Sequence, residues 1–336
     1  MDKKTIYQNS TNAVMFIVSI SILVYFCISK NNLLTLMEII PHLNYFWLAI
    51  ALFSMMLSLF FDSMVLNILI SDMTHKIYKK SSSFKLTMVG QFFTSITPFG
   101  VGGQPMQIVH LAKQKIQVGS AISILVIKFL VYQSSMVLYS LLAIIFKFGM
   151  FSLKIPGFIP LSIIGFLSQC FTVFLFILFY VNKKFTNKII SGVCFLLSKI
   201  KIIKNPDSIN QKIQKQLDLF IKSNNYMQRN KVLTIKLYML TFLQLTALFC
   251  IPFFIFKAFH YKGFPCIDMI ATQAFVTMIS SYTPLPGAAG TTEGSFIVLF
   301  KEFFNQDIVS IAMILYRFIT YYLNIIISFI VIKTTC

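Results

Sequence analysis

Four ionisable side chains lie within or beside strongly apolar segments of this sequence: Asp62, Lys128, Glu293 and Arg317. A charge at hydrocarbon depth is costly, so such a group usually faces a partner or an aqueous path, where it could bind a charged ligand. Glu293 and Arg317 are close enough in chain order to pair, either within a binding or gating site or as a fixed structural ion pair. Lys128 lies one turn before Tyr132, which predicts one wet helix face, whereas for Asp62 solvent exposure near a helix end explains the charge equally well.

Two stretches rich in proline and glycine, 97–105 and 283–294, interrupt apolar sequence, and their Thr-Pro pairs begin 186 positions apart, at Thr97 and Thr283. Proline and glycine do not continue a helix, and unpaired backbone is costly in hydrocarbon, so such breaks persist there only beside protein or a watery cavity. We therefore expect these breaks to form a substrate-binding site with Glu293 and Arg317. The alternative is that their small residues only permit close helix packing. The predicted contributors from the breaks are Thr97, Pro98, Gly100, Gly102, Gly103, Gln104, Thr283, Pro284, Gly287, Gly290 and Thr292.

The ends of the two breaks predict helix starts. Pro105 suits the first residue of a helix that runs to about Lys113, because its missing N–H would be unpaired there anyway. The free N–H groups and the positive dipole end of that helix would favour an anion such as a phosphate. In the second break, Thr291 or Thr292 can cap the helix that follows.

The elements that must position these residues are membrane helices. With 57% hydrophobic residues, 12% charged residues and a mean hydropathy of +0.79, a chain of 336 residues has too few polar groups to cover a soluble globule. We therefore predict an all-α, polytopic membrane protein with six full spans and two broken re-entrant hairpins. The predicted spans are 13–29, 44–70, 118–146, 157–181, 232–256 and 307–332, and the predicted hairpins are 86–112 and 266–304.

Lysine and arginine counts set the predicted orientation. The basic loops 71–88 and 182–231 are assigned to the cytoplasm, which places both termini inside and makes the two hairpins enter from opposite faces. Three full crossings per half then invert the second copy, so the sequence predicts an inverted repeat of 1–156 and 157–336. Apolar spacing within 208–226 predicts a helix on the inner membrane surface or a packed cytoplasmic helix.

The net charge of +19 is concentrated, because eleven of the 29 lysines and arginines lie in 183–231. Positive-inside bias is the simplest explanation, with docking of anionic lipid, RNA or a protein partner as alternatives. The six cysteines and four histidines are scattered, and no C-x-x-C, Ser/His/Asp, H-E-x-x-H or P-loop pattern occurs. We therefore expect no metal, no cofactor and no catalytic residue.

Three motifs occur in order along the chain: Thr97-Pro98-x-Gly100-x-Gly102-Gly103-Gln104-Pro105-Met106-Gln107, Pro284-Leu285-Pro286-Gly287-x-x-Gly290-x-x-Glu293-Gly294 and Tyr316-Arg317-x-x-Thr320-Tyr321-Tyr322. They resemble motifs of the lysylphosphatidylglycerol synthase transmembrane family, which includes the flippase-like membrane region of the multiple peptide resistance factor. The chain departs from the family pattern at Gln104, where many relatives carry Glu, and at Ala288-Ala289, where the second break is poorer in glycine. The resemblance implies a membrane phospholipid as partner: an anionic or aminoacylated lipid moved between leaflets of a bacterial cell membrane, in the context of antibiotic resistance against cationic peptides.

In full-length relatives, a separate cytoplasmic domain transfers lysine from lysyl-tRNA to phosphatidylglycerol. This chain stops at Cys336, directly after the last predicted span, so the resemblance implies a lipid translocator rather than an enzyme. A phosphatidylglycerol lysyltransferase that docks tRNA on 183–231 is the main alternative, but that segment offers only Arg229 and Tyr226 for base contact and stacking. A membrane partner of a separate lipid-modifying enzyme is another alternative. DNA is not an expected partner, and a homo-oligomer is compatible with the sequence.

Overall fold

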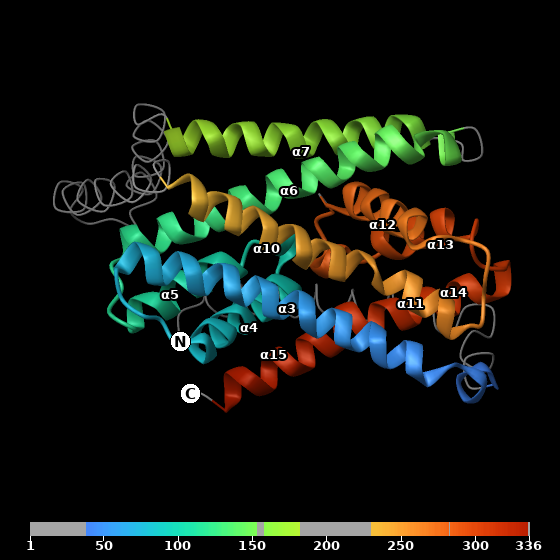
Figure 1. Ribbon diagram of the computed structural model, residues 1–336, viewed down its shortest axis with the longest axis horizontal. Coiled ribbons are helices and arrows are strands. Elements are labelled where there is room, and N and C mark those ends of the chain that lie inside the picture. The colour runs from blue at the N-terminus through green and yellow to red at the C-terminus, as the bar shows by residue number, and fades with distance from the viewer. Residues whose placement is uncertain (1–37, 153–157, 182–229, 282, 335–336) are drawn as a thin grey trace, which may run out of the picture.

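The chain folds into a bundle of helices in the computed structural model, which describes residues 38–152, 158–181, 230–281 and 283–334 (Figure 1). Every regular element in these ranges is a helix. The predicted all-α class is therefore confirmed. The predicted span 13–29 and the predicted surface helix within 208–226 lie outside the described residues.

Five apolar stretches in the described ranges are long enough to cross a membrane, and they match five of the six predicted spans. Three of them are single helices, and the other two are interrupted. The helices are α3 (Tyr45–Thr74), α6 (Val118–Ser152), α7 (Phe158–Val181), α10 (Lys231–Phe249) with α11 (Ile251–Ala258), and α14 (Gln306–Arg317) with the π-helical segment η5 (Phe318–Tyr322) and α15 (Leu323–Lys333).

Local sequence explains where these helices start, bend and end. The Asn44 side chain accepts a hydrogen bond from the N–H of Phe46 and caps α3, which ends at His75 in the left-handed conformation. Its 30 residues give a length of about 45 Å, which exceeds the roughly 30 Å of bilayer hydrocarbon. Between α10 and α11 the helix is broken beside Pro252, because proline has no N–H for the carbonyl four residues earlier.

Both predicted breaks are present, and each divides a helical hairpin. The first hairpin is α4 (Lys80–Ile96), the short 3₁₀ turn η3 (Pro98–Gly100) and α5 (Gly103–Lys113). The second is α12 (Cys266–Ser280), the 3₁₀ turn η4 (Pro286–Ala288) and α13 (Thr291–Phe300). In Figure 1 the first hairpin lies toward the end of the bundle where α3 ends, and the second lies toward the opposite end.

In the described residues, the broken hairpin and the helix that follows it occur in both halves of the chain, in the same order. Three pairs of equivalent elements begin 188 residues apart. Their first residues are Pro98 and Pro286, Gly103 and Thr291, and Val118 and Gln306. This offset is two residues longer than the 186 residues that separate the Thr-Pro pairs. Helices α3 and α10 lie side by side and run in opposite directions, as the colour gradient of Figure 1 shows. The inverted repeat of 1–156 and 157–336 stays a prediction, because the predicted span 13–29 lies outside the described residues.

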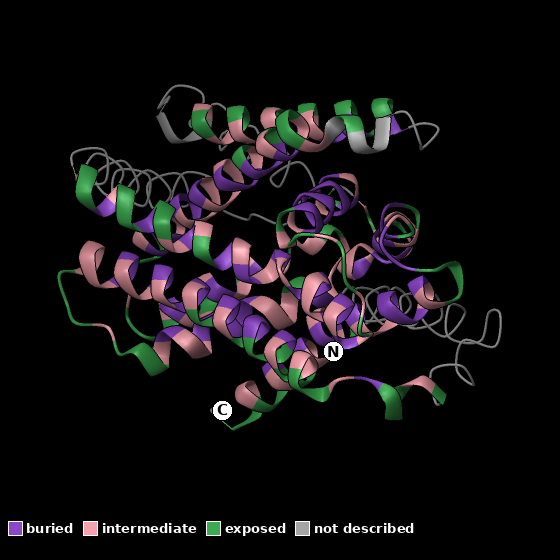
Figure 2. Ribbon diagram, turned by 45° about the vertical axis from the view of Figure 1, so that its right-hand side comes forward, coloured by how far each residue is buried: buried purple, intermediate pink, exposed green. Residues whose placement is uncertain are grey.

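The core lies between the two halves and is rich in aromatic side chains. Phe256, Phe275, Phe296 and Phe300 are fully buried. The ring of Phe296 stacks on Phe300 at 4.1 Å and on Tyr316 at 5.1 Å, so the second hairpin is fixed against α14. Figure 2 shows the buried residues gathered in the centre of the bundle, whereas α7, at the top, is largely exposed.

Candidate binding site between the two helix breaks

The two breaks meet in the centre of the bundle, beside a cavity of about 510 Å³. The backbone N–H of Phe99, in the first break, donates to the carbonyl of Pro284, in the second, at 3.3 Å. Two side chains of the last helix complete the junction: the Tyr321 hydroxyl donates to the carbonyl of Ser95 at 2.8 Å, and the Asn324 amide donates to a side-chain oxygen on α4 at 3.2 Å. Two segments distant in sequence thus form one site.

The backbone turns in the same way in both breaks. Pro98 is followed by Phe99 and Gly100 with φ of 54° and 66°, and Pro286 is followed by Gly287 and Ala288 with φ of 61° and 52°. Consecutive left-handed residues are unfavourable for L-amino acids, and such strain persists mainly at functional positions. The same turn thus connects the two helices of each hairpin.

The helix that follows the first break starts earlier than predicted. Helix α5 begins at Gly103, so Pro105 is its third residue and not its first; the missing N–H still falls within the first turn, where it would have no helical partner. A Cβ at Gly103 would lie 2.1 Å from the Thr94 hydroxyl and 2.7 Å from the carbonyl of Gly90, so only glycine allows this approach to α4. The Thr97 hydroxyl accepts from the N–H of Gly102 at 2.9 Å and holds the turn.

The predicted threonine cap of the second helix is wrong. Gly290 occupies the N-cap position with φ of 87°, and its N–H donates to the carboxylate of Glu293 at 2.7 Å. The Thr291 hydroxyl instead bonds the carbonyl of Ala288 at 3.1 Å. Glu293 caps the helix in place of a threonine because a carboxylate that accepts from a backbone N–H near the positive helix end forms a strong, charge-assisted hydrogen bond.

The predicted pairing of Glu293 with Arg317 is confirmed. Their side chains approach to 2.7 Å and are only 1% and 5% exposed. Arg317 also donates to the carbonyl of Gly287 at 3.0 Å, and its guanidinium lies 4.6 Å from the centre of the Tyr321 ring. A Cβ at Gly287 would lie 2.2 Å from that ring, so glycine is needed for this contact. The arginine faces the cavity, and the carboxylate lies behind it and holds it in place.

Asp62 is not at an exposed helix end. It is buried near the middle of α3, and its carboxylate accepts a 2.8 Å bond from the Lys128 ammonium of α6. Of the two explanations for this charge, solvent exposure is therefore wrong and a buried partner is confirmed, 66 residues away in the chain. Both side chains and Tyr132 line the cavity, which agrees with the predicted wet face of that helix.

The π-helical segment η5 lies in the last span, beside the cavity. Arg317 ends α14, and the wider turn of Phe318–Tyr322 follows directly. Such π-bulges often occur at functional sites, because they change which side chains face inward. Here Tyr316, Arg317, Thr320 and Tyr321 all line the cavity.

The structure brings most of the predicted site residues together, although some support the cavity from behind. The predicted residues that line it are Asp62, Gly100, Gly103, Gln104, Lys128, Tyr132, Thr283, Gly287, Thr292 and Arg317. Those outside the lining are Thr97, Pro98, Gly102, Pro284, Gly290 and Glu293. Substrate contact by any of them stays a prediction.

Many neutral polar residues of the cavity were missed. They are amides and hydroxyls in apolar helices, and their signal would have been polar residues that recur at helical spacing, such as Thr87, Gln91 and Thr94 on α4. The missed lining residues include Thr87, Gln91, Thr94, Gln107, Gln244, Gln273, Thr277, Ser280, Thr320 and Asn324.

Sequence analysis also did not predict a close pair of cysteines outside the cavity lining. Cys250, between α10 and α11, and Cys266, at the start of α12, are free and half-buried, with their sulfur atoms 3.8 Å apart. Neither residue belongs to a C-x-x-C motif, so their proximity follows only from the packing of α11 against the second hairpin.

The fold and cavity define a polytopic helical membrane protein in which two broken hairpins meet around paired buried charges. The chain belongs to the family described as lysylphosphatidylglycerol synthase TM region, whose family model matches residues 12–328. It is also similar to a UPF0104 membrane protein of Archaeoglobus fulgidus, with 26% identity over 246 residues, which cover 72% of this chain and 73% of that protein.

Proposed function

We propose that this protein translocates a phospholipid with an anionic or aminoacylated headgroup between the leaflets of a membrane. The observation that carries the proposal is the polar cavity where two hairpins from opposite ends of the bundle meet. Broken helices whose starts face a central site are the usual binding arrangement of transporters with inverted repeats. Family membership supports the proposal, since it assigns the chain to the membrane region of lipid-modifying proteins.

The cavity chemistry suits a charged headgroup. Its volume of about 510 Å³ falls within the roughly 300–1,000 Å³ of ligand pockets. Arg317 and Lys128 offer cationic donors to a phosphate, and the start of α5 adds the positive end of a helix. Asp62 offers an acceptor for an amine. The proposed cavity thus replaces water around the headgroup while it crosses the hydrocarbon.

The outer surface of the first break suits acyl chains. Phe99 and Val101 are 62% and 64% exposed, and Phe318 of the last span is 51% exposed. Of these side chains Phe99 also lines the cavity, so a lipid could place its headgroup inside while its tails remain in the bilayer. This separation is what a lipid translocator needs.

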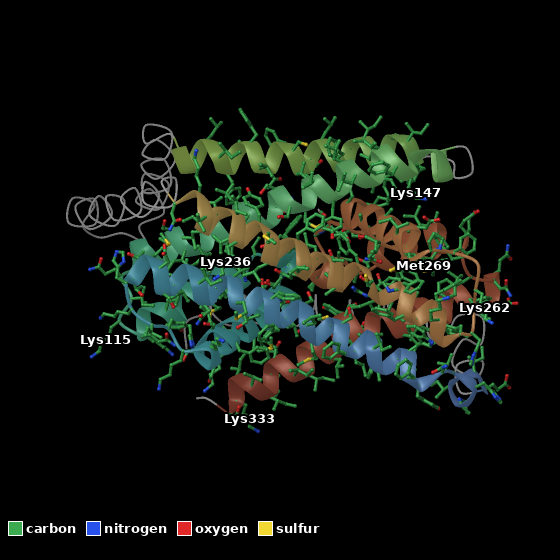
Figure 3. All side chains as sticks on the ribbon, in the orientation of Figure 1. Lys115, Lys147, Lys236, Lys262, Met269 and Lys333 are labelled. Atoms are coloured by element: carbon green, nitrogen blue, oxygen red, sulfur yellow. The ribbon has the colours of Figure 1, made fainter. Side chains whose placement is uncertain are left out.

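Charge at the two ends of the bundle supports the predicted orientation. Figure 3 shows Lys115, Lys236 and Lys333 at one end and Lys147 and Lys262 at the other. The first end also carries the basic loop 75–80 and the start of α4. By the positive-inside rule we propose that this end faces the cytoplasm of a bacterial cell, with both termini inside.

Reconstitution in vesicles tests the proposal. Fluorescent phosphatidylglycerol placed in both leaflets should become fully accessible to a membrane-impermeant quencher with the wild-type protein, and only half accessible in protein-free vesicles. Arg317→Ala should slow this exchange, whereas Lys115→Gln, outside the cavity, should not. No exchange by folded wild-type protein, or equal exchange by both variants, would overturn the proposal. Formation of lysyl-phosphatidylglycerol from added lysyl-tRNA would favour the transferase alternative instead.

A further inference from the structure

A second cavity lies at the end of the bundle where basic residues gather. It has a volume of about 460 Å³, lies between α3, the start of α4 and the end of α15, and shares no lining residue with the central cavity. It also lies outside all three sequence motifs. The two cavities therefore call for separate explanations.

One part of this groove is polar and positive. Lys80, Ser81 and Lys85 line it from the first turns of α4, and Asn67 lines it from α3. No acidic residue lies in the first turn of α4, and its N-cap residue Lys79 makes no side-chain cap. Within the described ranges, neither lysine of the groove has a carboxylate partner at ion-pair distance. Two lysine side chains and the uncapped start of a helix thus line one groove, which favours an anion.

The other part of the groove is apolar. It is lined by Phe60 and Met64 of α3, Phe84 of α4 and Val331 of α15. Phe60 lies seven residues before Asn67, which places it about 10 Å deeper along the helix. A free phosphate would need only the polar part. The change from lysine to aromatic side chains over this depth matches a molecule that is anionic at one end and hydrocarbon at the other.

We infer that this groove binds one phospholipid with a net negative headgroup, taken from the leaflet at the basic end of the bundle. Its phosphate lies between Lys80 and Lys85, and the upper part of one acyl chain lies along Phe60 and Phe84. Because α4 leads into the first break and packs against α15, the lipid holds the base of the first hairpin against the last helix. This role is independent of lipid translocation.

Photo-crosslinking in nanodiscs tests the inference. Nanodiscs contain phosphatidylcholine with a small fraction of photoactivatable phosphatidylglycerol, and adducts are mapped by chymotryptic peptide mass spectrometry. Wild type should give adducts on peptides that carry 60–67, 80–85 or 331–334. A surface lysine near anionic lipid contributes about 1 kcal/mol, or about five-fold in affinity, so Lys80→Gln with Lys85→Gln should lower this labelling by about thirty-fold.

Controls separate this site from other anion sites. Lys113→Gln with Lys115→Gln removes two exposed lysines at the same end of the bundle and should leave labelling of the groove unchanged. Phe60→Ala should lower it, because the acyl chain loses a contact, and excess inorganic phosphate should not compete. Unchanged labelling in the folded Lys80→Gln, Lys85→Gln variant would overturn the inference. Full competition by phosphate would also overturn it, because the groove would then bind a free anion.

Discussion

Replacing Glu293 by Gln should destabilise the protein strongly, although the two side chains have nearly the same shape. The carboxylate is 1% exposed and neutralises Arg317 at 2.7 Å. Breaking a buried ion pair by removing one partner costs about 3–5 kcal/mol. We expect a loss of about 3 kcal/mol, at the low end of that range, because Arg317 keeps the carbonyl of Gly287 and the ring of Tyr321.

Replacing Arg317 by Gln should cost more, about 4–5 kcal/mol, because the carboxylate left behind keeps only the N–H of Gly290. The double variant, Glu293→Gln with Arg317→Gln, leaves no buried charge at this place. We expect its loss to be smaller than the sum of the single losses by about 2 kcal/mol, a coupling typical of residues in direct contact.

The single tryptophan of the chain, Trp47, provides the assay. It stacks on Phe254 of α11, with ring centroids 6.2 Å apart, so its fluorescence should report separation of α3 from α11 during unfolding in mixed micelles. Asp307→Asn is the matched control, because this carboxylate is exposed in the first turn of α14 and should contribute at most about 1 kcal/mol. Single variants within about 1 kcal/mol of wild type and an additive double variant would refute the buried pair.

Three further changes test other parts of the site. Gly287→Ala should lower the free energy of unfolding by at least about 2 kcal/mol in the same assay, because φ is 61° and the new Cβ would lie 2.2 Å from an aromatic ring. A neutral effect would contradict this geometry. Asp62→Asn should lower the free energy of unfolding by about 2 kcal/mol, because Lys128, whose side chain is 17% exposed, loses its ionic partner. A variant as stable as wild type would indicate an open, hydrated site. Diamide, which accepts two electrons and two protons, should join Cys250 to Cys266 before it modifies Cys170, as detected by peptide mass spectrometry; equal reaction of all three would disprove their proximity.

The positions of the spans and breaks could be predicted because the required signals are local. Hydropathy marks each crossing, and Pro98 and Pro286 mark the two turns. The π-helical segment could not be predicted in this way, because Phe318–Tyr322 contains no proline or glycine to mark a change in helix winding. Local sequence thus determined the elements but not their fine geometry.

Site residues could be predicted from the sequence where they are charged and lie close to their partners along the chain. Glu293 and Arg317 lie in the same part of the sequence, so their pairing could be anticipated. Asp62 and Lys128 are 66 residues apart, and nothing in the sequence links them. Neutral amides such as Gln244 and Gln273 gave no signal, because an amide in an apolar helix is less costly than a charge.

The two buried ion pairs of the cavity each stay within one half of the chain. Asp62 and Lys128 both belong to the first half, and Glu293 and Arg317 both belong to the second. In the described residues, Lys147 and Asp268 form the ionic contact between halves, and it lies at the end of the bundle with 28% and 12% of the side chains exposed. Movement of one half against the other therefore leaves the buried charges neutralised.

The contacts that join the halves at the cavity are neutral hydrogen bonds. They run from Phe99 to Pro284, from Tyr321 to Ser95 and between Asn324 and α4. Each such bond contributes about 1 kcal/mol net, so parting all three costs about 3 kcal/mol, whereas parting a single buried ion pair costs about 3–5 kcal/mol. For the proposed translocation, this arrangement means that the two breaks can separate and admit a headgroup without leaving any charge unpaired in the membrane.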